Sequence, residues 1–241
     1  MSAWEHEAEH WVRWARTPDF DSYWRYRDAF FDEVVPAAGM RTIDIGCGEG
    51  RVSRDLAERG HRVVGLDLSE TLARAAAEAD PISAYAAGDA ASLPFSHGAF
   101  DIAVAYNSIQ NVLDLGGAVR EAARVLAPGG RLCICMTHPM TDAGRFESEE
   151  DGAAFVIREP YLEERWLDET FERDGLTMRF VGPAHPLEDY ARALEDAGFL
   201  IELIREPAMP RPRDPSDARW QGIPMFMFVR AVKANAPPPP S

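Results

Sequence analysis

Three glycines and the acidic residue before them are the part of this chain that most clearly specifies a chemistry. Asp44, Gly46, Gly48 and Gly50 occupy alternate positions and begin within a short apolar run. Glycine adopts positive φ angles and lets a ligand approach the backbone without meeting a Cβ atom. The free N–H groups at the start of a following helix can then face a bound polar group. The pattern predicts a nucleotide-type cofactor site at the carboxyl end of the first strand of an α/β sheet.

The spacing of these glycines argues against a dinucleotide. The dinucleotide fingerprint is G-x-G-x-x-G, and its third glycine allows a helix to pack closely on a strand. In this chain Arg51 occupies the place of that third glycine. Asp44 is unfavourable for a negatively charged pyrophosphate and suits a ligand with a positive amino group or sulfonium. Cys47 has the small side chain that such a loop tolerates, and the loop as a whole is expected to contact the cofactor.

At these residues the sequence resembles the class I S-adenosylmethionine-dependent methyltransferases, whose first motif has the form D-x-G-x-G-x-G. Three further motifs follow in the family's order between about residues 40 and 137. They are an apolar segment that ends in Asp67, a Gly-Asp-Ala segment with Asp89 and Ala90, and a Pro-Gly-Gly turn before the fifth predicted strand. An acid about 20 residues after the glycine loop suits ribose hydroxyls in a NAD site as well as in an S-adenosylmethionine site.

The resemblance implies that the cofactor is S-adenosyl-L-methionine and assigns residues to it. It places Asp67, with Leu68 after it, at the ribose, the Asp89 carboxylate on the adenine amino group, and the Ala90 backbone beside the adenine ring. Asn107 follows the fourth predicted strand and opens onto the same cofactor.

The first 36 residues are unusually rich in aromatic side chains, with helices expected at about 3–16 and 20–35. One interpretation is that these aromatics anchor the two helices to the edge of the sheet. The other follows related small-molecule methyltransferases, in which an N-terminal cap covers the cofactor and walls the acceptor pocket. Under this second interpretation Tyr23 and Tyr26 contact the cofactor.

Alternating strands and helices with short turns predict a parallel, doubly wound, Rossmann-like α/β sheet. The segment after the fifth strand, residues 138–184, breaks this alternation. It is either a lid over the acceptor, as is frequent in the family, or a β-excursion that widens the edge of the sheet. Two final strands predict the family's antiparallel hairpin and a total of seven strands. Strands are expected at about 41–46, 62–67, 82–87, 100–106, 131–137, 200–206 and 225–232, and further helices at about 51–59, 69–79, 116–126 and 186–198.

One domain is expected at 1–235, because 241 residues with 46% hydrophobic side chains can bury one good core. Within it, residues 1–36 form the helical cap and 138–184 the lid-like insertion. The segment 207–224 contains five prolines and is predicted to be a loop. The proline-rich tail at 236–241 cannot pack a core and is predicted to be disordered.

Composition excludes several other classes of protein. A formal net charge of −15 repels phosphate backbones, so nucleic acid is not expected as a substrate. No apolar run approaches the ~18 residues of a membrane span, and the N-terminus lacks the features of a signal peptide. A cytoplasmic protein is therefore expected, as a monomer or homodimer with a small-molecule acceptor. Cys133 and Cys135 alternate along a strand and are predicted core residues, and no metal site is expected.

Two histidines are candidates for a catalytic base. Methyl transfer from a sulfonium needs orientation above all, and removing the proton of a phenol or carboxylic acid helps further. His138 immediately follows the fifth strand and is the leading candidate, because histidine titrates near pH 6.5 when unperturbed. Alternatively it only lines the pocket or caps the strand. His185 is the second candidate, although many relatives carry His-Arg-Pro-Leu where this chain has Ala-His-Pro-Leu, so the aligned histidine is missing.

The predicted reaction is methyl transfer to a small organic acceptor, with oxygen favoured over carbon or nitrogen. The Asn-Pro-Pro-Tyr/Phe motif of nucleic-acid amino methyltransferases is absent after the fourth strand, where the chain reads Asn107-Ser-Ile-Gln110. One alternative is a protein that binds S-adenosylmethionine but catalyses a non-methylating reaction. A nicotinamide-dependent oxidoreductase and a non-enzymatic interaction module are two others.

Overall fold

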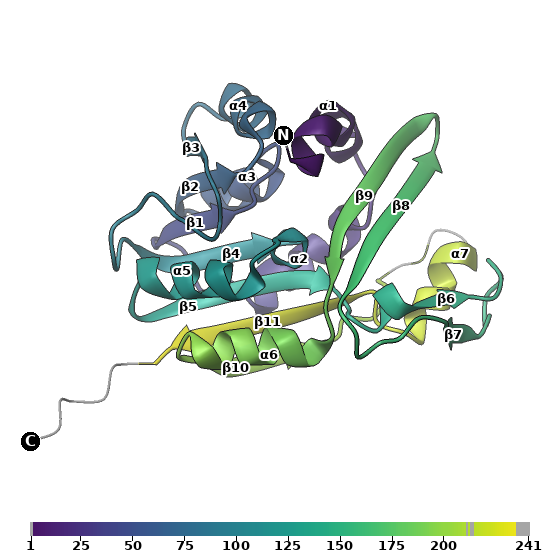
Figure 1. Cartoon of the computed structure of the whole chain (residues 1–241). Coiled ribbons are helices and arrows are strands. Elements are labelled where there is room, and N and C mark those ends of the chain that lie inside the picture. Colours follow the sequence, from purple (N-terminus) through teal and green to yellow (C-terminus); the bar gives the residue numbers. More distant parts are fainter. Residues whose placement is uncertain (1, 211, 213–214, 235–241) are drawn as a thin grey trace, which may run out of the picture.

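A seven-stranded sheet forms the centre of the structure, a computed structural model that describes residues 2–210, 212 and 215–234 (Figure 1). The strand order is β10-β11-β5-β4-β1-β2-β3, and only β11 runs against the others. This arrangement confirms the Rossmann-like fold and its final antiparallel hairpin. The strands are β1 (Arg41–Ile45), β2 (Arg62–Asp67), β3 (Ala84–Ala87), β4 (Phe100–Tyr106), β5 (Leu126–Thr137), β10 (Phe199–Arg205) and β11 (Phe226–Lys233).

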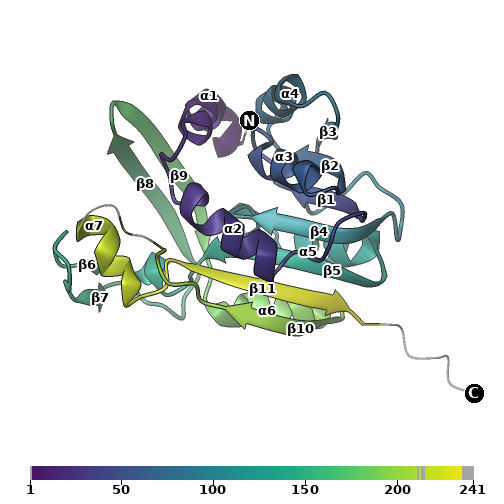
Figure 2. The same cartoon turned by 180° about the vertical axis from the view of Figure 1, so that it is seen from behind.

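Helices cover both faces of this sheet. One face packs against α2 and α3, which Figure 2 shows in front of the sheet, and the other packs against α5 and α6. Side chains of one strand alternate between these two cores. Cys133 and Cys135 point to the α2 face and Ile134 to the α5 face, which confirms the two cysteines as core residues. The helices are α1 (Ala3–Arg16), α2 (Tyr23–Glu33), α3 (Arg51–Glu58), α4 (Glu70–Ala79), α5 (Leu115–Val125) and α6 (Leu187–Asp196).

The insertion after β5 folds into two small hairpins. A short 3-10 turn η2 (Thr141–Ala143) leads into β6 (Gly144–Phe146) and β7 (Phe155–Ile157), and β8 (Arg165–Arg173) pairs with β9 (Leu176–Ala184). Neither hairpin joins the seven-stranded sheet. The interpretation of this segment as a widening of the sheet's edge is therefore wrong. The β8–β9 hairpin instead projects from the sheet and packs beside α1 (Figures 1 and 2).

Two boundaries differ from the sequence prediction. The fifth strand already begins at Leu126, because Leu126 pairs with Phe100 before the Pro-Gly-Gly turn shifts the register. The segment 207–224, predicted to be a loop, contains the short helix α7 (Pro215–Ala218) and a 3-10 turn η3 (Arg219–Gln221). Proline is favourable at the first position of a helix, where its missing N–H is not needed. The predicted tail at 236–241 lies outside the described residues.

Candidate functional site

The glycine loop joins β1 to α3 in the conformation that the sequence predicts. Gly46, Gly48 and Gly50 have φ angles of 71°, 57° and 89°. This left-handed region costs other residues roughly 1–2 kcal/mol. The backbone N–H groups of Gly46 and Cys47 donate to the carbonyl oxygen of Leu66 at 2.7 and 3.0 Å. The loop is thereby tied to the end of β2.

Two other parts of the chain come close to this loop, and both require glycine. A Cβ atom on Gly46 would lie 2.4 Å from Ser108 Cβ, and one on Gly48 would lie 2.9 Å from Trp11 Nε1. Ser108, after β4, donates its hydroxyl to the Ile45 carbonyl at 2.5 Å. Its neighbour Asn107 has a φ of 52° and so stands in the same left-handed region. The end of β4 and helix α1 therefore both border the loop.

Two carboxylates lie beneath and beside the loop. Asp67, at the end of β2, accepts hydrogen bonds from Gly48 N and Ser69 N, both at 2.8 Å. Burial raises the pKa of Asp67, and these two bonds oppose the shift. Asp44 is 1% exposed and accepts the Ser53 hydroxyl at 2.6 Å. Burial raises its pKa to about 7. Asp44 therefore supports the loop from inside, whereas Asp67 stands at its rim.

The remaining predicted cofactor residues lie at the same edge of the sheet. Leu68 follows Asp67 and is 55% exposed. Asp89 follows β3, is exposed, and accepts the backbone N–H of Ala91 at 2.8 Å, which fixes the turn that contains Ala90. Because β1 to β4 are parallel neighbours, their carboxyl ends bring these groups together. Cys47 is different, since its side chain is buried and its pKa is raised well above the usual value.

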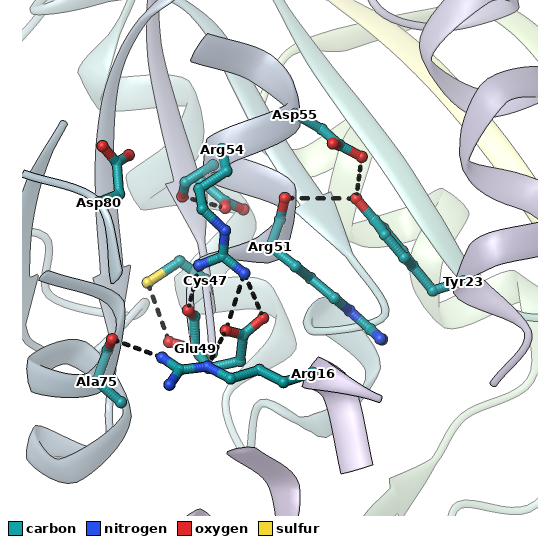
Figure 3. Close-up of polar contacts among 12 residues, drawn as sticks. Arg16, Tyr23, Cys47, Glu49, Arg51, Arg54, Asp55, Ala75 and Asp80 are labelled. Carbon is teal, nitrogen blue, oxygen red and sulfur yellow. Dashed lines mark hydrogen bonds and ion pairs between the residues drawn. The ribbon is translucent and has the colours of Figure 1, made fainter. Parts of the chain in front are cut away.

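Hydrogen bonds and an ion pair fasten helix α1 over the loop at both of its ends. Glu5, in its first turn, accepts hydrogen bonds from the hydroxyls of Ser69 and Thr71 at the start of α4. Arg16, in its last turn, donates to the Glu49 carboxylate at 2.9 Å and to the Ala75 carbonyl at 2.8 Å, as Figure 3 shows. Between these fastenings the indole of Trp11 lies on Gly48. The first helix therefore covers the glycine loop.

Glu49, inside the glycine loop, is a residue whose importance the sequence analysis missed. Its side chain is fully buried, and both carboxylate oxygens lie 2.9 Å from Arg54 Nη2 in addition to the contact with Arg16 (Figure 3). A buried carboxylate must be paired to be tolerated. The only signal in the sequence was the position of this acidic residue between two glycines of the loop.

Tyr23 and Tyr26 are core residues, which makes their assignment to the cofactor wrong. The Tyr23 hydroxyl donates to Asp55 Oδ2 at 2.5 Å, and Tyr26 is 0% exposed and packs on Phe226 at 4.9 Å between ring centroids. Their helix lies on the sheet face beside α3. The guanidinium of Arg51 stacks between Tyr23 and Trp11, at 4.2 and 5.0 Å from the ring centroids, and so links the two helices.

The two candidate bases differ in what their ring nitrogens do. His138 Nε2 lies 3.0 Å from a Glu206 carboxylate oxygen, and its Nδ1 accepts the Met140 N–H at 3.2 Å. Both nitrogens are thus engaged, so His138 fits the alternative reading of a residue that caps the strand. His185 Nδ1 lies 3.4 Å from Asp189, but its Nε2 is buried without a hydrogen-bond partner among the described residues.

The inner face of the β8–β9 hairpin continues the cover that α1 begins. Phe180 packs its ring edge-on against Trp4, Trp11 and Trp14, with centroids 6.2 to 6.4 Å apart. Two residues further along β9, a Cβ atom on Gly182 would lie 3.3 Å from Asn111 Oδ1. This hairpin face therefore runs from helix α1 to the turn after β4. Within the described part of the chain, no three His, Cys, Asp or Glu side chains are grouped as metal ligands.

These residues fit S-adenosyl-L-methionine and not a dinucleotide. Arg51 stands where the dinucleotide fingerprint has its third glycine, so the spacing of the loop does not match that fingerprint. Asp67 retains lone pairs on both fixed oxygens, which suits two ribose hydroxyls.

No helix among the described residues is both long and apolar enough to cross a bilayer.

Comparison with known proteins gives the same assignment. A family model described as "Methyltransferase domain" matches residues 43–134. An S-adenosylmethionine-dependent methyltransferase from Mesorhizobium loti superimposes with a TM-score of 0.69 at 26% identity, covering 89% of this chain and 99% of that one. This chain has the domain and the fold of a class I S-adenosylmethionine-dependent methyltransferase. The cofactor of that family is S-adenosyl-L-methionine.

Curated relatives of this methyltransferase match its cofactor half. The ubiquinone/menaquinone biosynthesis C-methyltransferase UbiE of Roseobacter denitrificans is 38% identical over 119 residues, which is 45% of this chain and 47% of that protein. The demethylmenaquinone methyltransferase of Beutenbergia cavernae is 36% identical over 109 residues, 45% of each. The chain thus matches about half the length of these relatives.

Proposed function

We propose that this protein transfers the methyl group of S-adenosyl-L-methionine to a small organic acceptor that carries a hydroxyl group. One observation supports the proposal above all. The left-handed glycine loop, the fixed carboxylate of Asp67, and the turns with Asp89 and Asn107 stand together at the carboxyl edge of β1 to β4. Ligands of open α/β sheets bind at this edge.

Each group at this edge has a proposed task. Asp67 accepts hydrogen bonds from the ribose hydroxyls beside Leu68, and Asp89 accepts one from the adenine amino group next to Ala90. The glycine loop and Asn107 hold the amino-acid end. When bound, the cofactor supplies an electrophilic methyl carbon. Helix α1 and the insertion at 138–184 keep water away from it, the insertion acting as the lid of a single domain that spans 1–235.

The atom that receives the methyl group is proposed to be oxygen first and carbon second. A deprotonated hydroxyaromatic ring is nucleophilic at both its oxygen and its ring carbons. The relative from Roseobacter denitrificans is named a C-methyltransferase, which supports the carbon alternative. Both reactions need a group that removes the hydroxyl proton. The free Nε2 of His185 could hydrogen-bond that hydroxyl, whereas both nitrogens of His138 are engaged.

Calorimetry and product mass spectrometry test this function. S-adenosylhomocysteine is expected to bind the purified protein, and NADH is expected not to bind. Methyl-¹³C-labelled S-adenosylmethionine, incubated with 1-naphthol, should yield a product heavier by one labelled methyl group. Binding of the cofactor product without any methylated naphthol would favour the non-methylating alternative. Binding of NADH in its place would refute the proposal.

A further inference from the structure

Three buried polar atoms near the insertion have no hydrogen-bond partner among the described residues. They are Gln110 Oε1 in the turn after β4, Arg165 Nε at the start of β8, and His185 Nε2 at the end of β9. Gln110 and His185 are 9% and 7% exposed. Buried polar groups are normally satisfied, so each exception needs an explanation. A polar ligand bound between these elements would supply the missing partners.

The strand register connects these atoms to the cofactor side of the molecule. On the inner face of the hairpin, Glu169 pairs with Phe180, Leu167 with Gly182, and Arg165 with Ala184. Phe180 touches α1 over the glycine loop, and Gly182 touches the turn that contains Gln110. Four residues of a strand span about 13 Å. The pair of Arg165 and Ala184, next to His185, therefore lies about 13 Å along the hairpin from Phe180, which packs on the cover of the glycine loop.

Asp142 lies at the far end of this face. Arg165 Nη1 donates to the Asp142 backbone carbonyl at 2.8 Å, whereas the Asp142 carboxylate receives no hydrogen bond from any described residue. Burial raises the pKa of this carboxyl to about 7, although Arg165 and Arg145 oppose the shift. Burial also raises the pKa of the nearby Tyr190 hydroxyl, and the charge of Asp142 adds to that effect.

We propose that Asp142 is the catalytic base of the methyl transfer and that Gln110, Arg165 and His185 hydrogen-bond the acceptor. This inference rests on the proposed function and identifies the acceptor as a hydroxyaromatic compound. Phe180 and the α1 tryptophans offer its ring an apolar wall. The three unpartnered atoms offer its polar groups an acceptor on Gln110, a donor on Arg165, and a ring nitrogen of His185 that donates or accepts according to its tautomer. A carboxylate without hydrogen bonds is a better proton acceptor than one that is already satisfied.

The step balances without any further reactant. The acceptor hydroxyl gives its proton to an Asp142 carboxylate oxygen. The electron pair left on the acceptor forms the new bond to the methyl carbon, and the sulfur retains the electron pair of the broken carbon–sulfur bond. The products are the methylated acceptor and neutral S-adenosylhomocysteine, and Asp142 then returns its proton to water.

Charged groups from every neighbouring element affect Asp142. Arg145 on β6 is engaged by Glu169, Arg165 on β8 holds the backbone of η2, and Tyr190 lies on α6. His185 Nδ1 is near Asp189 and its ring packs edge-on against Tyr190 at 5.9 Å. The two arginines keep the Asp142 carboxylate accessible to ionisation near neutral pH.

The test compares Asp142→Asn with Asp151→Asn, an exposed acid of the same insertion. The probes are 1-naphthol and the more acidic 4-nitro-1-naphthol. Wild-type kcat/KM for 1-naphthol should rise with pH to a plateau, with a midpoint near 7. D142N should lose about 100-fold or more in kcat, lose that pH dependence, and lose much less with 4-nitro-1-naphthol. D151N should behave as wild type.

Two further measurements distinguish a failure of this inference from a failure of the proposed function. Calorimetry should show that D142N binds S-adenosylhomocysteine within about twofold of wild type, whereas failure of wild type to bind would refute the proposed function itself. ¹³C NMR of aspartate-labelled protein should show a carboxyl that titrates near pH 7 and disappears in D142N. Titration of Asp142 near pH 4, wild-type kinetics in D142N, or cofactor binding without methylation of either naphthol would each overturn the inference.

Discussion

Replacing Glu49 by Gln tests whether α1 is fastened over the cofactor edge through one buried charge. The Glu49 side chain is fully buried, whereas the side chains of its partners Arg16 and Arg54 are 41% and 29% exposed. Gln preserves the shape and one acceptor oxygen but removes the charge. Helix α1 should then lose its C-terminal fastening, since Arg16 would turn to solvent.

The expected loss in the free energy of unfolding can be estimated from these contacts. Breaking a buried ion pair typically costs about 3–5 kcal/mol. The exposure of both arginines reduces this cost, because each can be hydrated once released, so about 3 kcal/mol is expected. For a domain of this length each 1 kcal/mol shifts Tm by about 2–4 °C. The Tm of E49Q should therefore fall by about 6–12 °C.

Urea unfolding and S-adenosylhomocysteine calorimetry measure the two consequences. Glu58→Gln, at an exposed residue of α3, the helix that follows the loop, is the matched control and should change stability by less than about 0.5 kcal/mol. Arg16→Gln removes only the fastening of α1, so affinity should fall about tenfold with little loss of stability. If E49Q unfolds at the same urea concentration as E58Q, or if Arg16→Gln binds as wild type, the reasoning about α1 fails.

Three further substitutions probe the cofactor edge. Asp67→Ala removes the acceptor proposed for two ribose hydroxyls and should weaken S-adenosylhomocysteine binding about 100-fold by calorimetry; unchanged affinity would remove Asp67 from the ribose. Gly46→Ala should cost more stability in urea than Gly129→Ala, because both have positive φ but only Gly46 faces Ser108, and adding Ser108→Gly should restore part of the loss. Burial raises the pKa of Asp44 from 3.8 to about 7, so the folded state binds its proton more tightly. Stability should therefore fall as pH rises from 4 to 7, by at most about 4 kcal/mol from this group. Asp44→Asn should flatten that slope in urea titrations, and an unaltered slope would contradict the assignment.

The sequence predicted the sheet and the cofactor edge because both rest on local signals. A positive φ favours glycine, and the position of a carboxylate at a strand end follows from the length of that strand, so Gly46 and Asp67 could be located from spacing alone. The boundary at Leu126 was missed because pairing with Phe100 across a turn is a tertiary contact. Strand pairing of this kind overrides local turn signals.

The N-terminal aromatics show why the rest of the site could not be read from the chain. Both helices carry dense aromatics, yet Tyr23 belongs to the sheet-face core while Trp11 covers the loop. No periodicity distinguishes a helix lying on the face of a sheet from one lying across its edge. For a similar reason nothing in the sequence singles out Asp142, since Arg165 and Tyr190, the groups it interacts with electrostatically, lie more than 20 residues away in sequence.

The separation of the two hairpins from the central sheet has a consequence for how such proteins diversify. Strands β6 to β9 satisfy their backbone hydrogen bonds within their own pairs, so exchanging them leaves no ladder of the main sheet broken. A graft of residues 144–184 from another member of the family should therefore redirect the enzyme to a new compound without disturbing the main sheet, provided that it reproduces the contacts of Phe180 with α1.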